Sequence, residues 1–510
     1  MPGEIPPPSR SSEAVTRGDV ARGAGLAGLA RLGAVIEAVA QPAYIWMFGV
    51  ATYGVYVVLW GAVSLASNLL DLSVTSALQR VVPTRGGEGE VHGAVKIALL
   101  AALIPTTLLA LIVCLNASVV AGLFSAAPED AARLPQAVAI FVWALPLWTF
   151  VEVATSAARA RRAFGPEIRL RIFWEQVARL VFALGFFLLG FQSIGLMLAH
   201  LCSLALTAAL CVRLLGRYYD LTLLLRAPVS ASLARTLLGT GLALLPADMA
   251  RRLLIDAPPV ALNLILPGAQ GAASAGLFEI ARKISTIPNI VRQAFRYVLA
   301  PLSAAQAHAD RAQIGPLYRF ACRVSAALVI PLAGALIFAG RDILSVYRPE
   351  AMAALAPLVV LAAARAVEAV VGPASEVVEM TGHRGLPLLN SVAGIGLGVV
   401  LAALLVPGMG ALGMAWAVAA AMIVSAAAAT LELGFSDRLS PFDSWLARTL
   451  LIAAAGLALM AAAEWAFAGP LRFIAVVLVW LAATWLALRF ALPREDRAAL
   501  GGLSRRLRLI

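Results

Sequence analysis

The sequence predicts an all-α membrane protein that crosses the bilayer about fourteen times. Its 510 residues are 61% hydrophobic and 13% charged, with a mean hydropathy of +0.88, whereas soluble globular chains carry about 25% charged residues. Apolar stretches of about 20 residues, long enough for a helix to cross the hydrocarbon core, follow one another along the chain. Cations gather in every second connection between these stretches, as they do on the cytoplasmic side of membrane proteins.

The beginning of the chain, over 1–22, is polar and contains a run of prolines at positions 6–8. The apolar stretch that follows includes Arg31 and Glu37, which disfavours a cleaved signal peptide. We therefore expect a disordered cytoplasmic tail over 1–22 and a retained first helix. Apolar windows predict membrane spans over 24–45, 52–79, 97–118, 135–157, 172–190, 193–214, 234–264, 273–300, 316–340, 352–379, 386–406, 409–431, 444–465 and 471–490.

The distribution of cations sets the predicted orientation. Connections on the side shared by both termini hold 26 Lys and Arg, and those on the other side hold 4. One missed or invented helix would destroy this bias, so it supports the helix count and predicts that both termini are cytoplasmic. It also explains the net charge of +12 without a nucleic-acid partner. The outer connections are short, the longest covering about 117–134, and leave no room for an external domain.

Two pairs of short segments indicate an internal repeat. "GFQSIGLMLA" from Gly190 matches "GMGALGMAWA" from Gly408, and "YGVY" at 53–56 resembles "AGLF" at 275–278, so the two pairs are separated by nearly the same length of chain. The alternative is a chance match between segments rich in Gly and Ala. A repeat of six helices predicts two bundles with a substrate path between them. The expected units are the cytoplasmic tail 1–22, the bundles 23–226 and 227–432, two extra helices in 433–492 and a basic cytoplasmic tail over 493–510.

The segment "FEIARKISTIPNIVRQAFRY" at 278–297 is the main candidate for the substrate path. Projected at 100° per residue, its nine polar side chains fill one half of a helix. Four of them are the cations Arg282, Lys283, Arg292 and Arg296. Each would cost about 2.5 to 3.5 kcal/mol if it faced lipid, so this half must face a polar cavity. The alternative is a helix lying on the membrane surface, which would invert the orientation of every later connection and contradict the charge count.

Other charged residues fall within the predicted spans. Asp248, Arg252 and Asp256 are spaced by four residues and can pair on one helix face, which leaves Arg251 as a surplus cation. We include Arg251 and Arg252 among the substrate-binding candidates, with a purely structural role as the alternative. Internal ion pairs are expected for Glu175 with Arg179 and for Arg365 with Glu368, and a hydrogen-bonded packing role for His200.

Three acidic residues have no obvious local partner. Glu37, Asp71 and Glu152 are candidates for proton or cation coupling, with simple exposure to the cavity as the alternative. The four cysteines form no metal-binding or disulfide pattern and are expected to pack as small apolar residues. The sequence also lacks nucleotide-binding, HExxH and GxSxG motifs. We therefore expect no metal, no cofactor and no enzymatic activity.

Two segments resemble a known family. "FGVATYGVYVVLWGAVSLASNLLDLSVTSALQRVVPT" at 48–84 and "TGHRGLPLLNSVAGIGLGVVLAALLVPGMGALGMAWA" at 381–417 are similar to Wzx-type polysaccharide transporters of the multidrug/oligosaccharidyl-lipid/polysaccharide (MOP) superfamily. The resemblance implies a MATE/MOP-like fold of two six-helix bundles around a basic cavity, with Arg282, Lys283, Arg292, Arg296 and Arg251 as its cations. It covers most of the chain, and its motifs are diffuse glycines and aromatic residues.

The cations and the resemblance together predict a flippase. Arginine binds phosphate through paired hydrogen bonds, so a lipid with a phosphate or diphosphate head group is an expected cargo. The resemblance implies that this cargo is an undecaprenyl-diphosphate-linked oligosaccharide, moved across the cytoplasmic membrane by alternating access. The products would be O-antigen, capsule or exopolysaccharide, and the expected partners are membrane lipid, a polysaccharide polymerase and glycosyltransferases. One alternative is a lipid II flippase, because the related lipid II flippases also have two extra helices. Another is a MATE-type drug or metabolite antiporter. A membrane polymerase or ligase would need larger outer loops.

Overall fold

The computed structural model describes residues 32–161, 168–289, 291, 314–380, 385–500 and 502–509. Every regular element in these ranges is helical, which confirms the predicted all-α fold. The first part of the chain forms α2 (Leu32–Phe48), α3 (Val50–Leu70), α4 (Val74–Val81), η1 (Val82–Thr84), α5 (Glu88–Leu115), α6 (Ala117–Ala121), α7 (Pro128–Ala131), α8 (Leu134–Phe141), α9 (Ala144–Ala160), η2 (Ile168–Trp174), α11 (Glu175–Leu188), α12 (Gln192–Tyr218) and α13 (Leu221–Arg226). The second part forms α14 (Ala231–Ile265), α15 (Gly268–Ser285), α17 (Ile314–Phe338), α18 (Gly340–Leu344), η4 (Pro349–Ala354), α19 (Leu355–Val371), α20 (Pro373–Met380), α21 (Leu386–Met409), α22 (Ala411–Ser436), α23 (Ser444–Ala466), α24 (Gly469–Phe490), α25 (Arg494–Ala499) and α26 (Gly502–Arg506).

Ten helical segments in the described ranges are long and apolar enough to cross a membrane. They are α3, α5, α8 with α9, α12, α17, η4 with α19, α21, α22, α23 and α24. The protein therefore has the helical content of a multi-pass membrane protein. The remaining expected spans fall on α2, on η2 with α11, on α14 and on α15, and the total of fourteen stays a prediction.

The outward faces of the long helices are apolar. On α5 the exposed large side chains recur at helical spacing and include Ile104, Leu108, Ile112 and Leu115, the last 76% exposed. A soluble protein rarely exposes so large an apolar surface. This face of α5 is suited to contact with lipid chains.

The second predicted span is divided into two helices. α3 ends at Leu70 and α4 begins at Val74, whereas the sequence predicted one helix over 52–79. Leu72 and Ser73 have φ angles of 50° and 53°, in the left-handed region. The Asp71 carboxylate accepts hydrogen bonds from the Ser73 backbone N–H at 2.8 Å and the Thr75 hydroxyl at 3.2 Å. These local bonds offer the backbone an alternative to a continuous helix.

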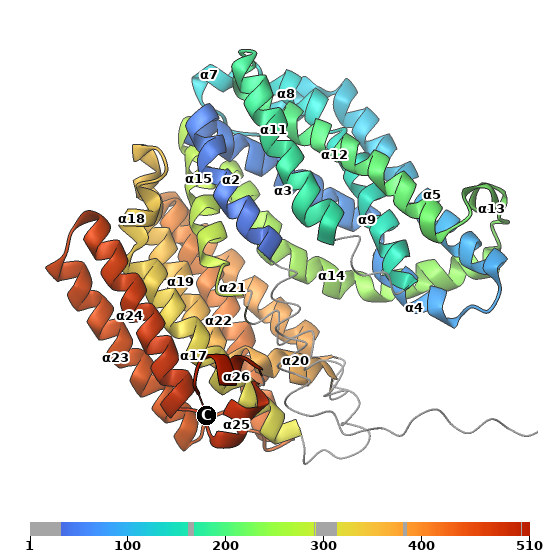
Figure 1. Ribbon diagram of the computed structural model, residues 1–510. Helices are drawn as coiled ribbons and strands as arrows, with labels where there is room; N and C mark the ends of the chain where they lie inside the picture. The colour runs from blue at the N-terminus through green and yellow to red at the C-terminus, as the bar shows by residue number, and fades with distance from the viewer. Residues whose placement is uncertain are drawn as a thin grey trace, which may run out of the picture.

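Two groups of helices meet along α14 and α15 (Figure 1). Helices α2–α13 lie in the upper right of this view and α17–α24 in the lower left. The 35-residue α14 packs against α3, α4 and α5 on one side and against α21 and α22 on the other. α15 contacts both α3 and α19. The proposed division at 226/227 stays a prediction, but the helices that begin the second part of the chain lie between the two groups.

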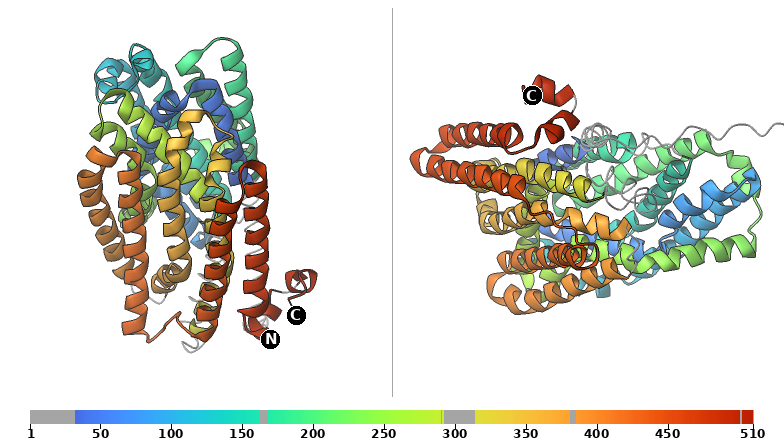
Figure 2. Two further views of the ribbon diagram at one scale, coloured as in Figure 1. Left: turned by 90° about the vertical axis from the view of Figure 1, so that its left-hand side faces the viewer. Right: turned by 90° about the horizontal axis from the view of Figure 1, so that it is seen from below.

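The last two long helices form a hairpin fastened at both ends. α23 and α24 pack on each other and on α17, and Figure 2 shows them side by side at the edge of the molecule. At one end Arg323 of α17 pairs with Asp443, which precedes α23, and with Asp496 of α25 at 2.7 Å. At the other end Arg472 of α24 donates to both carboxylate oxygens of Asp342, in α18, at 2.6 and 2.8 Å. Two separate ion-pair sites therefore hold the hairpin to α17 and α18.

Candidate functional site

Glycines let α3 approach α14 and α15 closely. A Cβ atom on Gly54 would lie 1.8 Å from the Ala272 carbonyl oxygen of α15, and one on Gly276 would lie 2.5 Å from the Val50 carbonyl oxygen of α3. Further along α3, a Cβ on Gly61 would lie 2.8 Å from the Asp256 carbonyl oxygen of α14. Small residues at such crossings allow helix backbones to come into contact in membranes. The three helices consequently frame a common space.

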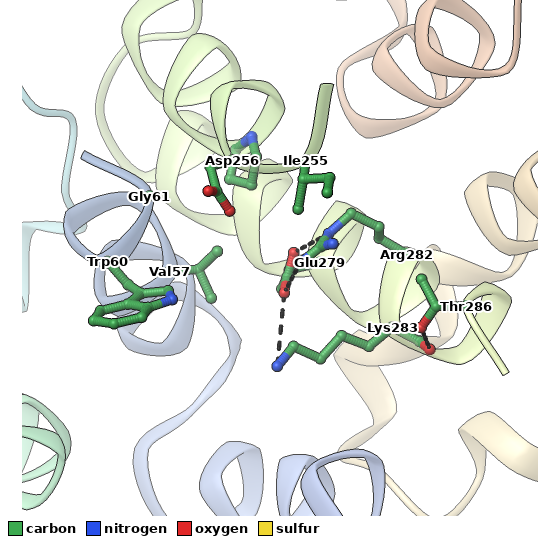
Figure 3. A pocket seen from close by; sticks show the side chains of 10 residues that line it. Val57, Trp60, Gly61, Ile255, Asp256, Glu279, Arg282, Lys283 and Thr286 are labelled. Carbon is green, nitrogen blue, oxygen red and sulfur yellow. Dashed lines mark hydrogen bonds and ion pairs between the residues drawn. The ribbon is translucent and has the colours of Figure 1, made fainter. Parts of the chain in front are cut away.

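That space is a cavity of about 240 Å³ between α3, α14 and α15 (Figure 3). Its volume is below the range of about 300 to 1,000 Å³ usual for sites that enclose a whole drug-sized ligand. A cavity of this volume can enclose one part of a larger molecule. The lining consists of Val57, Trp60 and Gly61 from α3, Ile255, Asp256 and Pro259 from α14, Glu279, Arg282 and Lys283 from α15, and Thr286 just after it.

The polar wall of the cavity is built around Glu279. Its carboxylate accepts two hydrogen bonds from Arg282, Nε to Oε2 at 2.7 Å and Nη2 to Oε1 at 2.6 Å. Lys283 Nζ lies 3.9 Å from Glu279 Oε1. Glu279 is 3% exposed, and the Arg282 and Lys283 side chains are about one fifth exposed, so the cations reach the cavity while the carboxylate behind them is buried. Figure 3 shows both cationic side chains converging on this carboxylate.

Acidic residues accompany the cations of the cavity wall. Asp256 faces the cavity from α14 and accepts a hydrogen bond from Ser64 Oγ of α3 at 2.7 Å. Two carboxylates thus accompany the two cations, which lowers the cost of keeping charged groups inside a membrane protein. The sequence predicted the cations of this face but not how closely acidic groups compensate them.

Four residues of the predicted polar helix half do line one cavity, namely Glu279, Lys283, Thr286 and Arg282. α15 ends at Ser285, a turn over 286–288 contains Pro288, and Asn289 and Val291 are again helical. The sequence predicted an interruption at this proline, as a kink within one helix over 273–300. The residue before a proline is disfavoured in the helical conformation, which accounts for an early end. Arg292 and Arg296, the other two predicted cations, lie outside the described residues.

A buried polar network supports the cavity from behind Trp60. The Trp60 ring centroid lies 4.3 Å from that of His200 and 5.0 Å from that of Trp148. His200 is fully buried, and its Nδ1 lies 3.0 Å from the Tyr56 hydroxyl, which also accepts a hydrogen bond from Arg179 at 3.2 Å. Arg179 in turn pairs with Glu175 at 2.6 Å. The expected packing role of His200 and the expected Glu175–Arg179 pair are both confirmed, as is the Arg365–Glu368 pair at 2.8 Å.

A second charged cluster joins α9, η2 and α14. Glu152 pairs with Arg171 at 2.7 Å, and Arg252 Nη2 lies 3.8 Å from the same carboxylate oxygen. The Arg171 guanidinium also lies 4.4 Å from the Trp148 ring centroid. Glu152 therefore has cationic partners, but they come from other helices, so the spacing along the sequence did not reveal them.

The pairing predicted within α14 differs from the observed one. Arg251 pairs with Asp248, whose other oxygen accepts a hydrogen bond from Ser76 at 2.9 Å. Arg251 is therefore not a surplus cation, and the ion pair of Arg252 is with Glu152 instead of Asp248 or Asp256. Asp71 has Glu152 and Asp248 as charged neighbours. Glu37 lies in α2, but its side chain is outside those that the structure describes. The coupling role of the three acidic residues stays a prediction.

Sequence reasoning missed the groups that α3 contributes to the site. Trp60 forms part of the cavity wall, and Ser64 donates a hydrogen bond to the Asp256 carboxylate. It also missed Arg171 of η2 as the ion-pair partner of Glu152 in the second cluster. The only signal for the α3 side was the glycine spacing of Gly54 and Gly61 within an apolar run. That pattern indicates a helix contact, but it does not name the partner helix.

Comparison with known proteins identifies the fold. No protein-family model matches the chain, and no curated protein sequence matches it. Among solved structures, the inward closed conformation of the lipid II flippase MurJ matches with a TM-score of 0.71 and 12% identity, over 91% of this chain and 97% of that one. An inward-facing multidrug resistance MATE family transporter of the MOP superfamily matches with a TM-score of 0.60 and 15% identity, over 82% and 94%.

A third solved structure is a MOP superfamily transporter from Pyrococcus furiosus, described as having a binding pocket of reverse polarity. It matches with a TM-score of 0.57 and 14% identity, over 82% of this chain and 94% of that one. These identities are low, so the likeness concerns the fold. The MOP-type fold implied by the resemblance is confirmed, whereas the Wzx-type assignment stays a prediction. The chain has the fold of the flippases and transporters of the MOP superfamily.

Proposed function

We propose that the protein is a flippase for a polyprenyl-diphosphate-linked saccharide, and that it binds the diphosphate in the cavity between α3, α14 and α15. The observation that carries this proposal is the convergence of Arg282 and Lys283 on one buried carboxylate beside an open space. Arginine can present two parallel N–H donors to a phosphate as it does to Glu279. A diphosphate entering the cavity would compete with Glu279 for these donors.

The size of the cavity suits a cargo of which only the head group enters. The polyprenyl chain of such a cargo stays in the bilayer, so the protein has to enclose the polar part alone. Glu279 and Asp256 balance the cations and keep them from lying uncompensated in the membrane. The two helix groups would rock against each other around this site, as expected for alternating access between repeats.

The proposed cargo serves surface polysaccharide assembly, as the family resemblance implies. Lipid II is a second candidate. A specific observation favours it, because the match to the MurJ structure covers 91% of this chain and the MATE match covers 82%. An antiporter of cationic drugs is less favoured, because the Arg282 and Lys283 side chains reach the cavity while the Glu279 carboxylate that they bind is buried. We propose the cytoplasmic membrane as the location, with both termini on the cytoplasmic side.

The test is the double variant Arg282→Gln with Lys283→Gln. We expect weaker binding of undecaprenyl diphosphate to the purified protein. We also expect less translocation in proteoliposomes, measured in two separate assays, one with a diphosphate-linked oligosaccharide and one with lipid II. Arg365→Gln is a matched control, because Arg365 also pairs with a carboxylate three residues away on its own helix but is not among the residues that line the cavity. Unchanged binding and transport by the double variant at normal protein levels would refute the proposal. The two cargo assays distinguish polysaccharide precursors from lipid II.

A further inference from the structure

The C-terminal residues fold into a defined unit at the end of α24. We call it the arginine cap: the end of α24, α25 and α26, with Arg489, Arg494, Arg497, Arg505, Arg506 and Arg508. Trp485 Nε1 donates to the Leu507 carbonyl at 2.9 Å, and Arg489 donates to the Arg508 carbonyl at 2.7 Å. Arg497 donates to the carbonyls of both Arg489 and Leu509, at 2.9 and 2.8 Å. These bonds fold the chain back onto α24.

Buried side chains attach the arginine cap to the helix bundle. Leu492 and Leu509 are at most 1% exposed and belong to one apolar cluster with Leu317 and Phe320 of α17. Asp496 is fully buried and accepts a hydrogen bond from Arg323 of α17. The arginine cap is therefore a packed part of the protein, whereas the sequence predicted only a basic tail over 493–510.

The arginine cap contains more arginines than acidic residues that could balance their charge. Residues 489–509 hold six arginines and two carboxylates, Glu495 and Asp496, and Asp496 is engaged by Arg323. Burial, and then repulsion by Arg489 and Arg494, lowers the pKa of Arg497. Arg505, Arg506 and Arg508 are exposed, and within the described residues no hydrogen bond or ion pair of their side chains is found. An anion placed against this surface would relieve the mutual repulsion of the arginines.

The position of the cap beside apolar side chains indicates which anion it meets. α25 and α26 project sideways from the lower ends of α23 and α24, at the edge of the molecule (Figure 2). Phe490, the last residue of α24, is 57% exposed, and Leu507 next to the arginines is 41% exposed. Exposed apolar side chains flanked by cations at the end of a membrane span are typical of a surface that lies at the level of lipid head groups. A soluble anion would not account for the apolar part.

We propose that the arginine cap is a binding surface for the phosphate head groups of anionic phospholipids in the surrounding leaflet. The guanidinium groups of Arg505, Arg506 and Arg508 supply the outward cations, and Phe490 and Leu507 enter the upper part of the acyl layer. The buried Asp496–Arg323 pair holds this surface at a fixed height relative to α17. This binding surface is independent of the cargo that the cavity takes.

The test measures lipid binding to the full-length protein in detergent by native mass spectrometry. Phosphatidylglycerol is titrated against the protein, with the zwitterionic phosphatidylcholine, which has no net charge, as the comparison. The cap variant replaces Arg505, Arg506 and Arg508 by Gln. The matched control replaces Arg213, Arg217 and Arg226 by Gln, since these three arginines are also exposed and lie on the side predicted to be cytoplasmic. A third variant, with Arg505→Lys, Arg506→Lys and Arg508→Lys, keeps the charge.

One cation near an anionic membrane contributes on the order of 1 kcal/mol, which is roughly a fivefold change in affinity, so three cations give on the order of 100-fold. We expect the cap variant to lose phosphatidylglycerol affinity by about this factor, the control to lose roughly fivefold or less, and the lysine variant to retain most of it. Added salt should weaken binding to the original protein more than to the cap variant.

Three results would overturn the proposal. The first is an equal loss in the cap variant and the control, which would mean that any exposed arginines have this effect. The second is a loss in the lysine variant as large as in the glutamine variant, which would mean that the substitutions act through folding and not through charge. The third is displacement of phosphatidylglycerol by excess inorganic phosphate, which would assign the cap to a soluble anion.

Discussion

A methyl group added at each glycine in the contacts of α3 with α14 and α15 should lower the stability of the protein, and the size of the loss should differ between the glycines. The nearest atoms to the added Cβ at Gly54, Gly276 and Gly61 are backbone carbonyl oxygens, which no side-chain rotation can move. Cβ atoms essentially never approach other atoms within 3.0 Å. Gly54→Ala therefore requires the contact to open from 1.8 to at least 3.0 Å. Gly276→Ala starts from 2.5 Å and Gly61→Ala from 2.8 Å, so the displacement of the partner helix that each variant needs becomes smaller in this order.

Overpacking of a well-packed interior typically costs about 1 to 3 kcal/mol, and we expect Gly54→Ala to reach or exceed the upper value and Gly61→Ala to stay below the lower one. The measurement is thermal unfolding of the purified proteins, with transport measured in parallel. Gly239→Ala in α14 is the control, because a Cβ there meets nothing within 4 Å and replacing Gly by Ala inside a helix stabilises by about 0.5 to 1 kcal/mol. Equal stability of the Gly54 and Gly239 variants would refute the close crossing of α3 and α15.

Three further predictions concern charged groups. Glu279→Gln should raise the affinity for undecaprenyl diphosphate roughly tenfold, measured by direct binding, because the carboxylate no longer competes for Arg282; unchanged affinity would contradict the proposed site. Arg323→Gln should lower thermal stability more than Arg472→Gln, since it removes the Arg323 guanidinium from the 1%-exposed Asp496 side chain. Breaking a buried ion pair costs about 3 to 5 kcal/mol. Burial raises the pKa of Asp443, but hydrogen bonds from Arg323 and the Leu446 N–H outweigh it, so the pKa lies below the ordinary 3.8. The resulting stabilisation of the folded protein is present above pH 3.8 and is lost as the pH falls through the lower pKa of the folded state. Asp443→Asn should therefore remove this acid dependence from unfolding curves.

The fold was largely predictable because hydropathy is a local property. Apolar length and the alternation of cations located most helices to within a few residues, and these signals need no knowledge of which helices touch. The predicted helix ends were less accurate where a side chain binds the backbone locally. At the break before α4, the Asp71 carboxylate accepts a hydrogen bond from the Ser73 N–H.

The ion pairs show the limit of such reasoning more clearly. Glu175–Arg179 and Arg365–Glu368 were predictable, because residues three or four apart share a helix face. The Glu152–Arg252 and Arg323–Asp496 contacts join residues that are distant along the chain. A helix projection gives the direction of a side chain but not the neighbour it faces. The acidic compensation of the cavity by Asp256, from α14, was hidden for the same reason.

The double fastening of the α23–α24 hairpin has a mechanical consequence. A single attachment would let the hairpin pivot, but the Arg323 and Arg472 pairs lie at opposite ends of the two helices and fix their tilt as well as their position. Any motion of α17 must therefore carry α23, α24 and the arginine cap along as one rigid lever. In a rocking transport cycle, lipid bound to the arginine cap would resist the movement of α17, α23 and α24, because the cap moves with these helices.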